Sequence, residues 1–435
     1  MKYGIAALLL CFGSFSATAA EQYKTGSDTC DGWPRAPIGM APGFCAGLVV
    51  IPPSESSQRI IAFPRLLLPL GGLNWLVTDM GHWNQHDGKV VKLTVQPGYA
   101  PVMTVLFSGL YMPHGLAKGP DGQVYVGEAT RVFRFDPNDS APAIEPVLTG
   151  LKRDEAHPGL HPLTFFLFDA NKDLLVTEGA PSDQCLKKDG KPDGDKQCSQ
   201  TEDDRIAAVR RYPYAGNGKW GTDYTVEAKG LRNPLAMVRH SSGTLLAGDN
   251  GMDFPPADTP FEELNVLTRG SHYGWPYCYE TNKPNPVWAA NAAMDCNSKA
   301  HTGAARLLPP HGAPLSALYY NGAMFPELRG RLLISLHGYR PAGARILAFQ
   351  VNRHGVPLLA PDAQYDSWAD KTGDQVTHKP YDGPAGQPLI LTPGWNEVPG
   401  RPKGSPVGLA VAGDGAIWVA ENTNGTILRI ARDRP

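Results

Sequence analysis

The sequence lacks the hallmarks of several large classes of protein. Charged residues make up 19% of the 435 residues and the net charge is −2, so nothing in the composition predicts binding to nucleic acid or to an anionic membrane. The chain contains no CxxCH motif for covalent haem, and no GxGxxG motif between a strand and a helix for a nicotinamide cofactor. After the N-terminal segment, no apolar run is long enough to span a bilayer.

Glycine and proline, in contrast, are abundant. The 48 glycines and 41 prolines together exceed a fifth of the residues, whereas average usage is nearer about an eighth. This excess predicts a chain rich in turns with few long helices. Apolar residues make up 42% of the chain, which is ample for a packed core and argues against disorder.

The first 20 residues have the composition of a secretory signal peptide. Lys2 is followed by an apolar stretch from Ile5 to Phe15, and the small residues Ala17 to Ala19 suit a cleavage site. We therefore expect residues 1–20 to be removed and residues 21–435 to form a single domain in the periplasm or outside the cell. A membrane anchor is the alternative, but the apolar stretch is too short for one.

Six cysteines remain after the signal peptide. An even number of cysteines in an exported protein predicts disulfides, and pairing sequence neighbours would close three short loops. A metal site is the alternative, but no CxxC or CxxH spacing supports it. The predicted pairs are Cys30–Cys45, Cys185–Cys198 and Cys278–Cys296.

Six stretches of the chain share one pattern of loop, apolar strand, turn and second strand. Their turns, such as Asp121–Gly122 and Asp414–Gly415, are typical of β-hairpins, and the strands that follow are rich in β-branched and aromatic residues. Six copies separated by insertions predict an all-β fold, a six-bladed β-propeller of four-stranded antiparallel blades with inserted loops. A β-sandwich is the alternative, but it would not reuse one unit six times. The copies begin at Phe63, Pro113, His161, Asn233, Pro314 and Ser405.

In such a propeller the inner strand of every blade begins at one end of the central axis. Side chains just before the inner strands therefore converge there, whatever their distance in the sequence. The residues that this places together are His114, His161, Arg232, Asn233 and Ser405.

Four segments carry a resemblance to a known family, and they occur in the family's order. Together they make the chain resemble the soluble glucose/sorbosone dehydrogenases that depend on pyrroloquinoline quinone (PQQ), from about residue 60 to residue 432. The resemblance implies PQQ- and calcium-dependent oxidation of a sugar or related alcohol or aldehyde, with electrons passed to an external cytochrome or quinone. The segments are HPLTFFLFDANKDLLVTEGAP, GLRNPLAM, DNGMDFPPADTPFEELNVLTRGSHYGWPYC and SPVGLAVAGDGAIWVAENTNGTILRI.

The resemblance assigns catalytic roles to three residues. His161 matches the general base, a role that suits imidazole because its pKa is near neutral. Arg232 and Asn233 match a pair beside the quinone, where a guanidinium and an amide would stabilise negative charge developing on oxygen. The alternatives are structural: a histidine bonded within its blade, and an arginine–carboxylate bridge between blades with an asparagine that caps a turn.

The resemblance also suggests the ligands of the cofactors. The backbone carbonyls of Gly251 and Met252 match a calcium-binding loop, and calcium prefers such hard oxygen ligands. PQQ carries three carboxylates, so its site needs several cations. The candidates are Arg232 with Asn233, His337, Arg340 and Arg401, and His114 is a candidate for lining the substrate site.

Three departures from the family pattern leave other functions open. Leu160 stands where the family has an acidic neighbour of the base, and Ser405 stands where a basic residue often precedes the last inner strand. The segment MGHWNQHDG, residues 80–88, has no assigned counterpart. A calcium-dependent lactonase-like hydrolase on a similar propeller, and a non-enzymatic propeller that binds a protein or glycan, are the alternatives.

Overall fold

A computed structural model describes residues 23–434 with gaps. The predicted signal peptide, Cys198, Arg340 and Arg401 lie outside the described residues. Within the range, the residues left out are 24, 54, 56–57, 84–85, 152–158, 188, 193–205, 257–258, 282, 291–294, 298, 339–342, 359–387 and 397–403.

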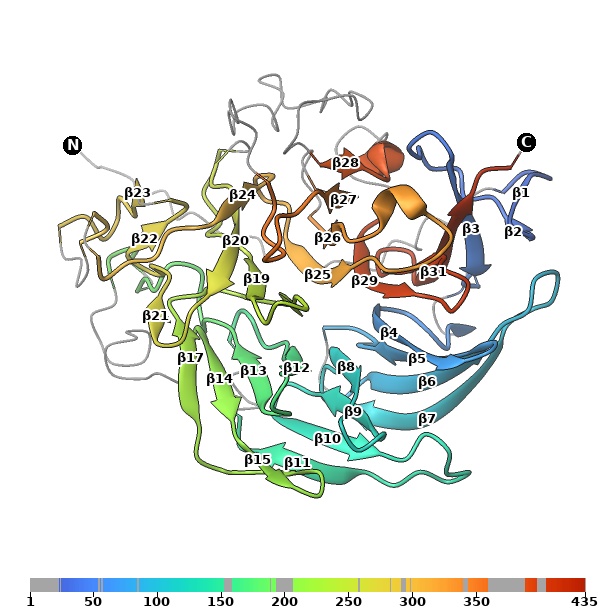
Figure 1. Ribbon diagram of the computed structural model, residues 1–435, viewed down its shortest axis with the longest axis horizontal. Coiled ribbons are helices and arrows are strands. Elements are labelled where there is room, and N and C mark those ends of the chain that lie inside the picture. Colours follow the sequence, from blue (N-terminus) through green and yellow to red (C-terminus); the bar gives the residue numbers. More distant parts are fainter. Residues whose placement is uncertain are drawn as a thin grey trace, which may run out of the picture.

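The chain folds into six antiparallel sheets arranged around one axis, and Figure 1 looks along this axis. The six-bladed β-propeller predicted from the repeats is confirmed, because each repeat supplies the first two strands of one blade. The first three blades comprise β4 (Pro64–Gly71), β5 (Asn74–Asp79), β6 (Gly88–Thr94) and β7 (Val102–Leu110); β8 (Gly115–Lys118), β9 (Val124–Gly127), β10 (Arg131–Phe135) and β11 (Glu145–Thr149); and β12 (Phe166–Phe168), β13 (Leu174–Glu178), β14 (Ala208–Tyr212) and β17 (Thr225–Lys229).

The remaining blades follow in chain order, except that the last blade takes its outer strand from the N-terminus. The insertions add two hairpins, β15 (Tyr214–Gly216) with β16 (Lys219–Trp220) and β22 (Cys278–Tyr279) with β23 (Lys283–Pro284). The three blades comprise β18 (Ala236–Arg239), β19 (Leu245–Asp249), β20 (Glu262–Leu267) and β24 (Arg306–Leu308); β25 (Pro314–Tyr319), β26 (Leu332–Leu336), β27 (Arg345–Phe349) and β28 (Leu389–Ile390); and β29 (Pro406–Val411), β30 (Ile417–Glu421), β31 (Thr426–Arg432) and β3 (Phe44–Val50).

Blade three departs from the predicted four strands. A short strand from the connection between β20 and β24, β21 (Ser271–His272), pairs with β17 in parallel, with Ala228 opposite Ser271. This fifth strand covers the outer edge of blade three, which would otherwise leave its backbone groups unpaired. The inserted loops therefore contribute to the sheet as well as to the surface.

The ring is closed in blade six, where β3 pairs with the last strand, β31. Asp31, between the short strands β1 (Thr29–Cys30) and β2 (Trp33–Pro34), forms an ion pair with Arg429 of β31. The predicted disulfide Cys30–Cys45 ties the same segment to β3. Closure therefore joins both ends of the domain by hydrogen bonds, charge and a covalent bond.

The predicted disulfides are confirmed where both partners are described. Cys278–Cys296 forms, like Cys30–Cys45, with a Cα separation of 5.7 Å. Cys185 is disulfide-bonded as well, but its predicted partner Cys198 lies outside the described residues. In the described part of the chain, no helix has the length and apolar character that a membrane span requires.

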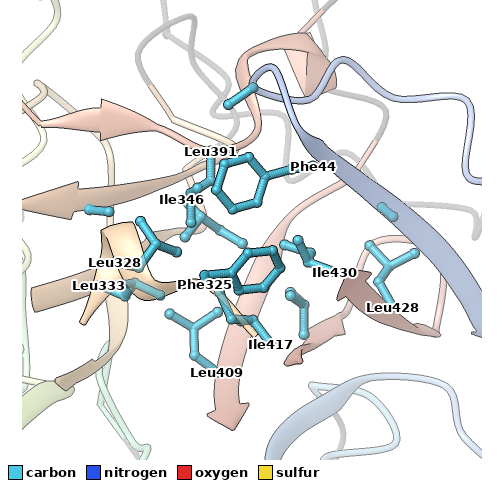
Figure 2. Close-up of a cluster of buried hydrophobic side chains, with 14 of the residues drawn as sticks. Phe44, Phe325, Leu328, Leu333, Ile346, Leu391, Leu409, Ile417, Leu428 and Ile430 are labelled. Carbon is cyan, nitrogen blue, oxygen red and sulfur yellow. The ribbon is translucent and has the colours of Figure 1, made fainter. Parts of the chain in front are cut away.

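The hydrophobic core lies between neighbouring blades, as expected for sheets that pack face to face. Figure 2 shows the contact between blades five and six, where Phe44 packs on Phe325 with ring centroids 4.7 Å apart. A separate cluster draws members from all six blades and therefore lies at the axis; we call it the axial cluster. Its buried members are Met80, Tyr111, Met112, Ala129, Leu163, Leu235, Leu315 and Val407.

Candidate functional site

The candidate site lies at the end of the axis where the inner strands begin. His161, Asn233 and Ser405 each stand two residues before a member of the axial cluster, in blades three, four and six. The topology therefore brings together these residues, which the repeats placed at equivalent positions. The axial cluster forms the apolar layer next to them.

Buried carboxylates hold the loops that enter the inner strands. Asp79, the last residue of β5, accepts a hydrogen bond from the Phe63 N–H at 2.6 Å. Glu421, the last residue of β30, accepts one from the Ser405 N–H at 2.8 Å. These acids satisfy backbone donors that have no strand partner, which explains why an Asp or Glu closes the second strand of several blades.

Blade five breaks this rule. Its second strand ends in Leu336, and the N–H of Ala313 is instead bound at 2.8 Å by Glu262 of blade four. Burial raises the pKa of Glu262 to about 7. Leu336 therefore occupies the position at which Asp79 and Glu421 stand in their blades, and the next residue, His337, adds an imidazole beside it.

His161 is buried and oriented by the segment that follows β13. Its Nδ1 lies 2.7 Å from the carbonyl oxygen of Ala180, so the ring proton sits on Nδ1 and the lone pair of the neutral ring on Nε2. A Cβ on Gly179 would lie 2.6 Å from the Cβ of His161 and 3.3 Å from Oδ1 of Asn233. The absence of a side chain at Gly179 therefore lets His161 and Asn233 approach each other. Leu160, whose N–H bonds to Pro181, remains 51% exposed.

Arg232 is buried and its charge is matched by two carboxylates. Its Nη2 lies 2.8 Å from Asp183 Oδ1 and 3.1 Å from Asp253 Oδ2, and its Nη1 donates to the carbonyl of Asn250 at 3.2 Å. Asp183 comes from the blade-three insertion and Asp253 from the loop after β19. Arg232 therefore joins two loops.

Asn233 combines a fixed backbone with an unused side-chain acceptor. The N–H groups of Arg232 and Asn233 both donate to Asp249, at 2.8 and 2.6 Å. Burial is the main cause that raises the pKa of Asp249 to about 7. In the described part of the chain, Oδ1 of Asn233 is buried without a hydrogen-bond partner. Such an orphaned polar atom points to a ligand or ordered water that completes it.

The predicted metal loop follows β19 directly. The N–H of Gly251 donates to Glu262, and the carbonyl of Met252 accepts a bond from the Phe254 N–H at 3.1 Å. The Sδ of Met252 is buried and accepts a hydrogen bond from the amide of Asn285 at 3.3 Å. The described residues contain no group of three or more His, Cys, Asp and Glu side chains suited to a metal ion, so a cation here would depend on carbonyl oxygens.

Arg65, which sequence reasoning missed, is a buried cation of a different kind. Its Nε donates to Nδ1 of His114 at 3.1 Å, and no carboxylate of the described residues lies within ion-pair distance. Burial lowers the pKa of Arg65 to about 9, so it stays charged at neutral pH. Burial, with the charge of Arg65, holds the pKa of His114 well below its usual range. The signal in the sequence is the FPR segment, where an arginine enters the first inner strand.

His337 lies near the same cation and is neutral as well. Its Nε2 is 2.9 Å from Oδ1 of Asn422, to which it donates. Burial, and then the charge of Arg65, lower the pKa of His337 to about 4. His337 and His114 therefore act as neutral hydrogen-bonding groups around Arg65. Arg340 and Arg401, the other predicted cations, lie outside the described residues.

The comparisons with known proteins agree with this architecture. The sequence model of the family described as Glucose / Sorbosone dehydrogenase matches residues 81–340, which is more than half of the chain. An uncharacterized protein of Borreliella burgdorferi is 31% identical over 134 residues, which span 29% of this chain and 35% of that protein. The chain therefore matches about a third of the length of this relative.

Three solved structures share the fold at low sequence identity. The holo form of the PQQ domain of pyranose dehydrogenase from Coprinopsis cinerea is 18% identical with a TM-score of 0.63, over 93% of this chain and 100% of that one. The calcium structure of a Trichoderma reesei enzyme of carbohydrate-active family AA12 is 18% identical with a TM-score of 0.64, over 91% and 97%. The PQQ-bound aldose sugar dehydrogenase of Streptomyces coelicolor is 18% identical with a TM-score of 0.54, over 90% and 100%.

Proposed function

This chain belongs to the glucose/sorbosone dehydrogenase family, and we propose that it oxidises a sugar or related alcohol with PQQ and calcium as cofactors. The observation that carries the proposal is Arg65, a buried guanidinium without a carboxylate partner among the described residues. A buried unmatched charge is costly, and an anionic ligand would offset that cost. Neighbouring structures with bound PQQ, and one with calcium, support this choice of cofactors.

The residues at the axis fit a ligand with several carboxylates. Arg65 would bind one of them, and the neutral imidazoles of His114 and His337 surround this cation. Asn233 presents, beside His161, an oxygen that has no hydrogen-bond partner among the described residues. Arg232 would stand beside the ligand with part of its charge already compensated by Asp183 and Asp253.

The proposed calcium ligands are the carbonyls of Gly251 and Met252. Glu262 binds the N–H of Gly251 in this loop, and Asp249 ends the strand before it; in their ionised forms these two acids would favour a cation here. Calcium would polarise the oxygens of the bound cofactor, and the loop carbonyls would supply part of its hard oxygen shell.

The proposed reaction needs one proton acceptor from the protein. His161 would take the substrate hydroxyl proton at Nε2, because the bond from Nδ1 to Ala180 fixes the tautomer with the lone pair on that atom. The protonated ring would keep the Ala180 bond, so its orientation does not change during the transfer. PQQ, when bound, supplies an ortho-quinone that accepts the hydride from the substrate carbon. The electrons would then pass to an external acceptor, a cytochrome or a quinone.

We further propose that the protein works in the periplasm or outside the cell. The disulfides Cys30–Cys45 and Cys278–Cys296 support an oxidising compartment. Cleavage after about residue 20 would leave the domain that the propeller occupies, and N-terminal sequencing of the secreted protein tests this.

The direct test is dye reduction by the mature protein loaded with calcium and PQQ, across a panel of aldoses and alcohols. His161→Ala should lower kcat by at least about 100-fold while PQQ binding is retained, because only the proton acceptor is lost. His354→Ala, an exposed histidine in a distant turn, is the matched control and should have no effect. Full activity in His161→Ala, or no turnover of any substrate by the loaded wild type, would contradict the proposal.

A further inference from the structure

The segment between β5 and β6, which the proposed reaction does not use, borders the site. Met80 belongs to the axial cluster, and its N–H bonds to the carbonyl of Phe63 at 2.9 Å, just before the inner strand that carries Arg65. The segment from Gly81 to Asp87 therefore leaves the protein core at the end of the axis where His161 and Asn233 lie.

This segment is closed tightly at its base. Gly81 has a φ of +73°, and a Cβ there would lie 2.3 Å from the carbonyl oxygen of Asp87. His82 contacts Phe63 edge-on with ring centroids 5.4 Å apart, and His86 stacks on Tyr111 of the axial cluster at 5.3 Å. Both histidines therefore anchor the loop against the entrances of blades one and two.

Trp83, between the two anchored histidines, is held out of the core. It is 52% exposed, whereas the other tryptophans of the described residues are at most 8% exposed. Full burial of a large apolar side chain would stabilise the fold. Because Trp83 forgoes this gain, its indole ring stays accessible to a ligand.

We propose that Trp83 is a rim subsite on which one face of a pyranose ring stacks. A pyranose has a face of C–H groups bordered by hydroxyls, and indole offers a flat apolar surface with a polar edge that matches it. This inference rests on the proposed function, because it takes the substrate to be a sugar. The stacked ring lies beside the entrances of blades one and two, and the reacting hydroxyl faces His161.

Accessibility of the indole to a quencher tests the contact without turnover. The mature protein, loaded with calcium and PQQ and kept without an electron acceptor, is titrated with acrylamide in the presence and absence of an aldose. The aldose should protect the most quenchable part of the tryptophan fluorescence. The Trp83→Phe variant should lack this readily quenched fluorescence, and the aldose should then have no effect on quenching. Quenching that the aldose leaves unchanged would overturn the proposal.

Kinetics then separate this proposal from the proposed function. Trp83→Ala should raise KM for the aldose by about 3- to 10-fold with kcat unchanged, as expected for lost aromatic contact. Tyr99→Ala is the matched control, since Tyr99 is 67% exposed in the same blade but follows β6 at the opposite end of the sheet. Sugar turnover with an unchanged KM in Trp83→Ala would overturn the rim subsite and leave the proposed function intact. If the loaded wild type turns over no sugar at all, the proposed function is rejected. If the aldose also leaves the quenching of the wild type unchanged, the rim subsite is rejected as well.

Discussion

Two buried arginines stand at the same end of the propeller, and they differ in how their charge is matched. Arg232 faces the carboxylates of Asp183 and Asp253 and joins an insertion to the predicted metal loop. Arg65 faces the neutral ring of His114, and burial lowers its pKa to about 9. The charge of Arg232 is matched within the protein, whereas Arg65 has no carboxylate partner among the described residues and would gain one from an anionic ligand.

The difference separates a residue that maintains structure from one that is kept for a ligand. Burying an ion costs several kcal/mol unless a partner compensates it, so an unmatched arginine lowers the stability of the protein without ligand. The family resemblance suggested Arg232 as a cofactor ligand, but in the structure Arg232 is paired with two carboxylates. The structure adds Arg65 as a candidate ligand. The same substitution at both positions tests the difference between the two arginines.

The largest effect is expected for Arg65→Gln. Glutamine removes the charge but keeps a donor for His114, so PQQ affinity should fall by at least about 100-fold, equivalent to about 2.7 kcal/mol. The protein without PQQ should gain about 1 kcal/mol in unfolding free energy, since a costly buried charge is gone. Titration with PQQ and denaturant unfolding measure the two quantities. Unchanged affinity together with reduced stability would assign Arg65 a purely structural role.

Arg232→Gln should act in the opposite direction on stability. The variant leaves Asp183 and Asp253 without a cation and removes the bond to the Asn250 carbonyl, so unfolding free energy should fall by about 2 kcal/mol. The expected loss of unfolding free energy is modest because Asp253 is 64% exposed and its charge is screened by water. Denaturant unfolding without PQQ is the measurement. A gain in stability would erase the distinction between the two arginines.

The smallest effect concerns pH. Burial raises the pKa of Glu421 to about 7, above its value in the unfolded chain, so its stabilising contribution is present at acid pH and is lost as the pH rises through 7. Arg65 has a lowered pKa of about 9, so its cost persists below that pH and is relieved as the pH rises through 9. Unfolding free energy should therefore be lowest between pH 7 and pH 9.

Two variants test which group causes the fall and which causes the recovery of the unfolding free energy with pH. Glu421→Gln, which mimics the protonated acid, should reduce the loss between pH 5 and pH 8 by on the order of 1 kcal/mol. Arg65→Gln should abolish its share of the recovery above pH 9. Thermal or denaturant unfolding from pH 5 to above pH 9 measures both changes. If neither variant alters the dependence of unfolding free energy on pH, these groups do not titrate as described.

The fold was predictable because its signals are local. Hairpin turns such as Asp121–Gly122 and the strands beside them specify the inner half of each blade within about 20 residues of sequence. The fifth strand of blade three was not predictable, because β21 pairs with β17 across the first three strands of blade four, β18 to β20. Such pairing depends on where the insertion is anchored by its own contacts.

The site was predictable in position but not in electrostatics. The repeats placed His161 and Asn233 at one end of the axis, as the structure does. The pairing of Arg232 with Asp183 depends on the path of the segment that carries Asp183. Whether Arg65 meets a carboxylate depends on which side chains all six blades bring to the axis, and the described residues bring none within ion-pair distance of it. Neither property can be predicted from a local sequence pattern, because both arise from contacts between segments that are distant in the sequence.

The central claim is that the axis end binds an anionic quinone, and titration of the calcium-loaded mature protein with PQQ tests it most directly. Absorbance changes of PQQ report binding without any assumption about the substrate. We expect saturable binding of one PQQ per chain that is lost on Arg65→Gln and retained in His161→Ala. Absence of binding by the wild type at tens of micromolar PQQ would contradict the account.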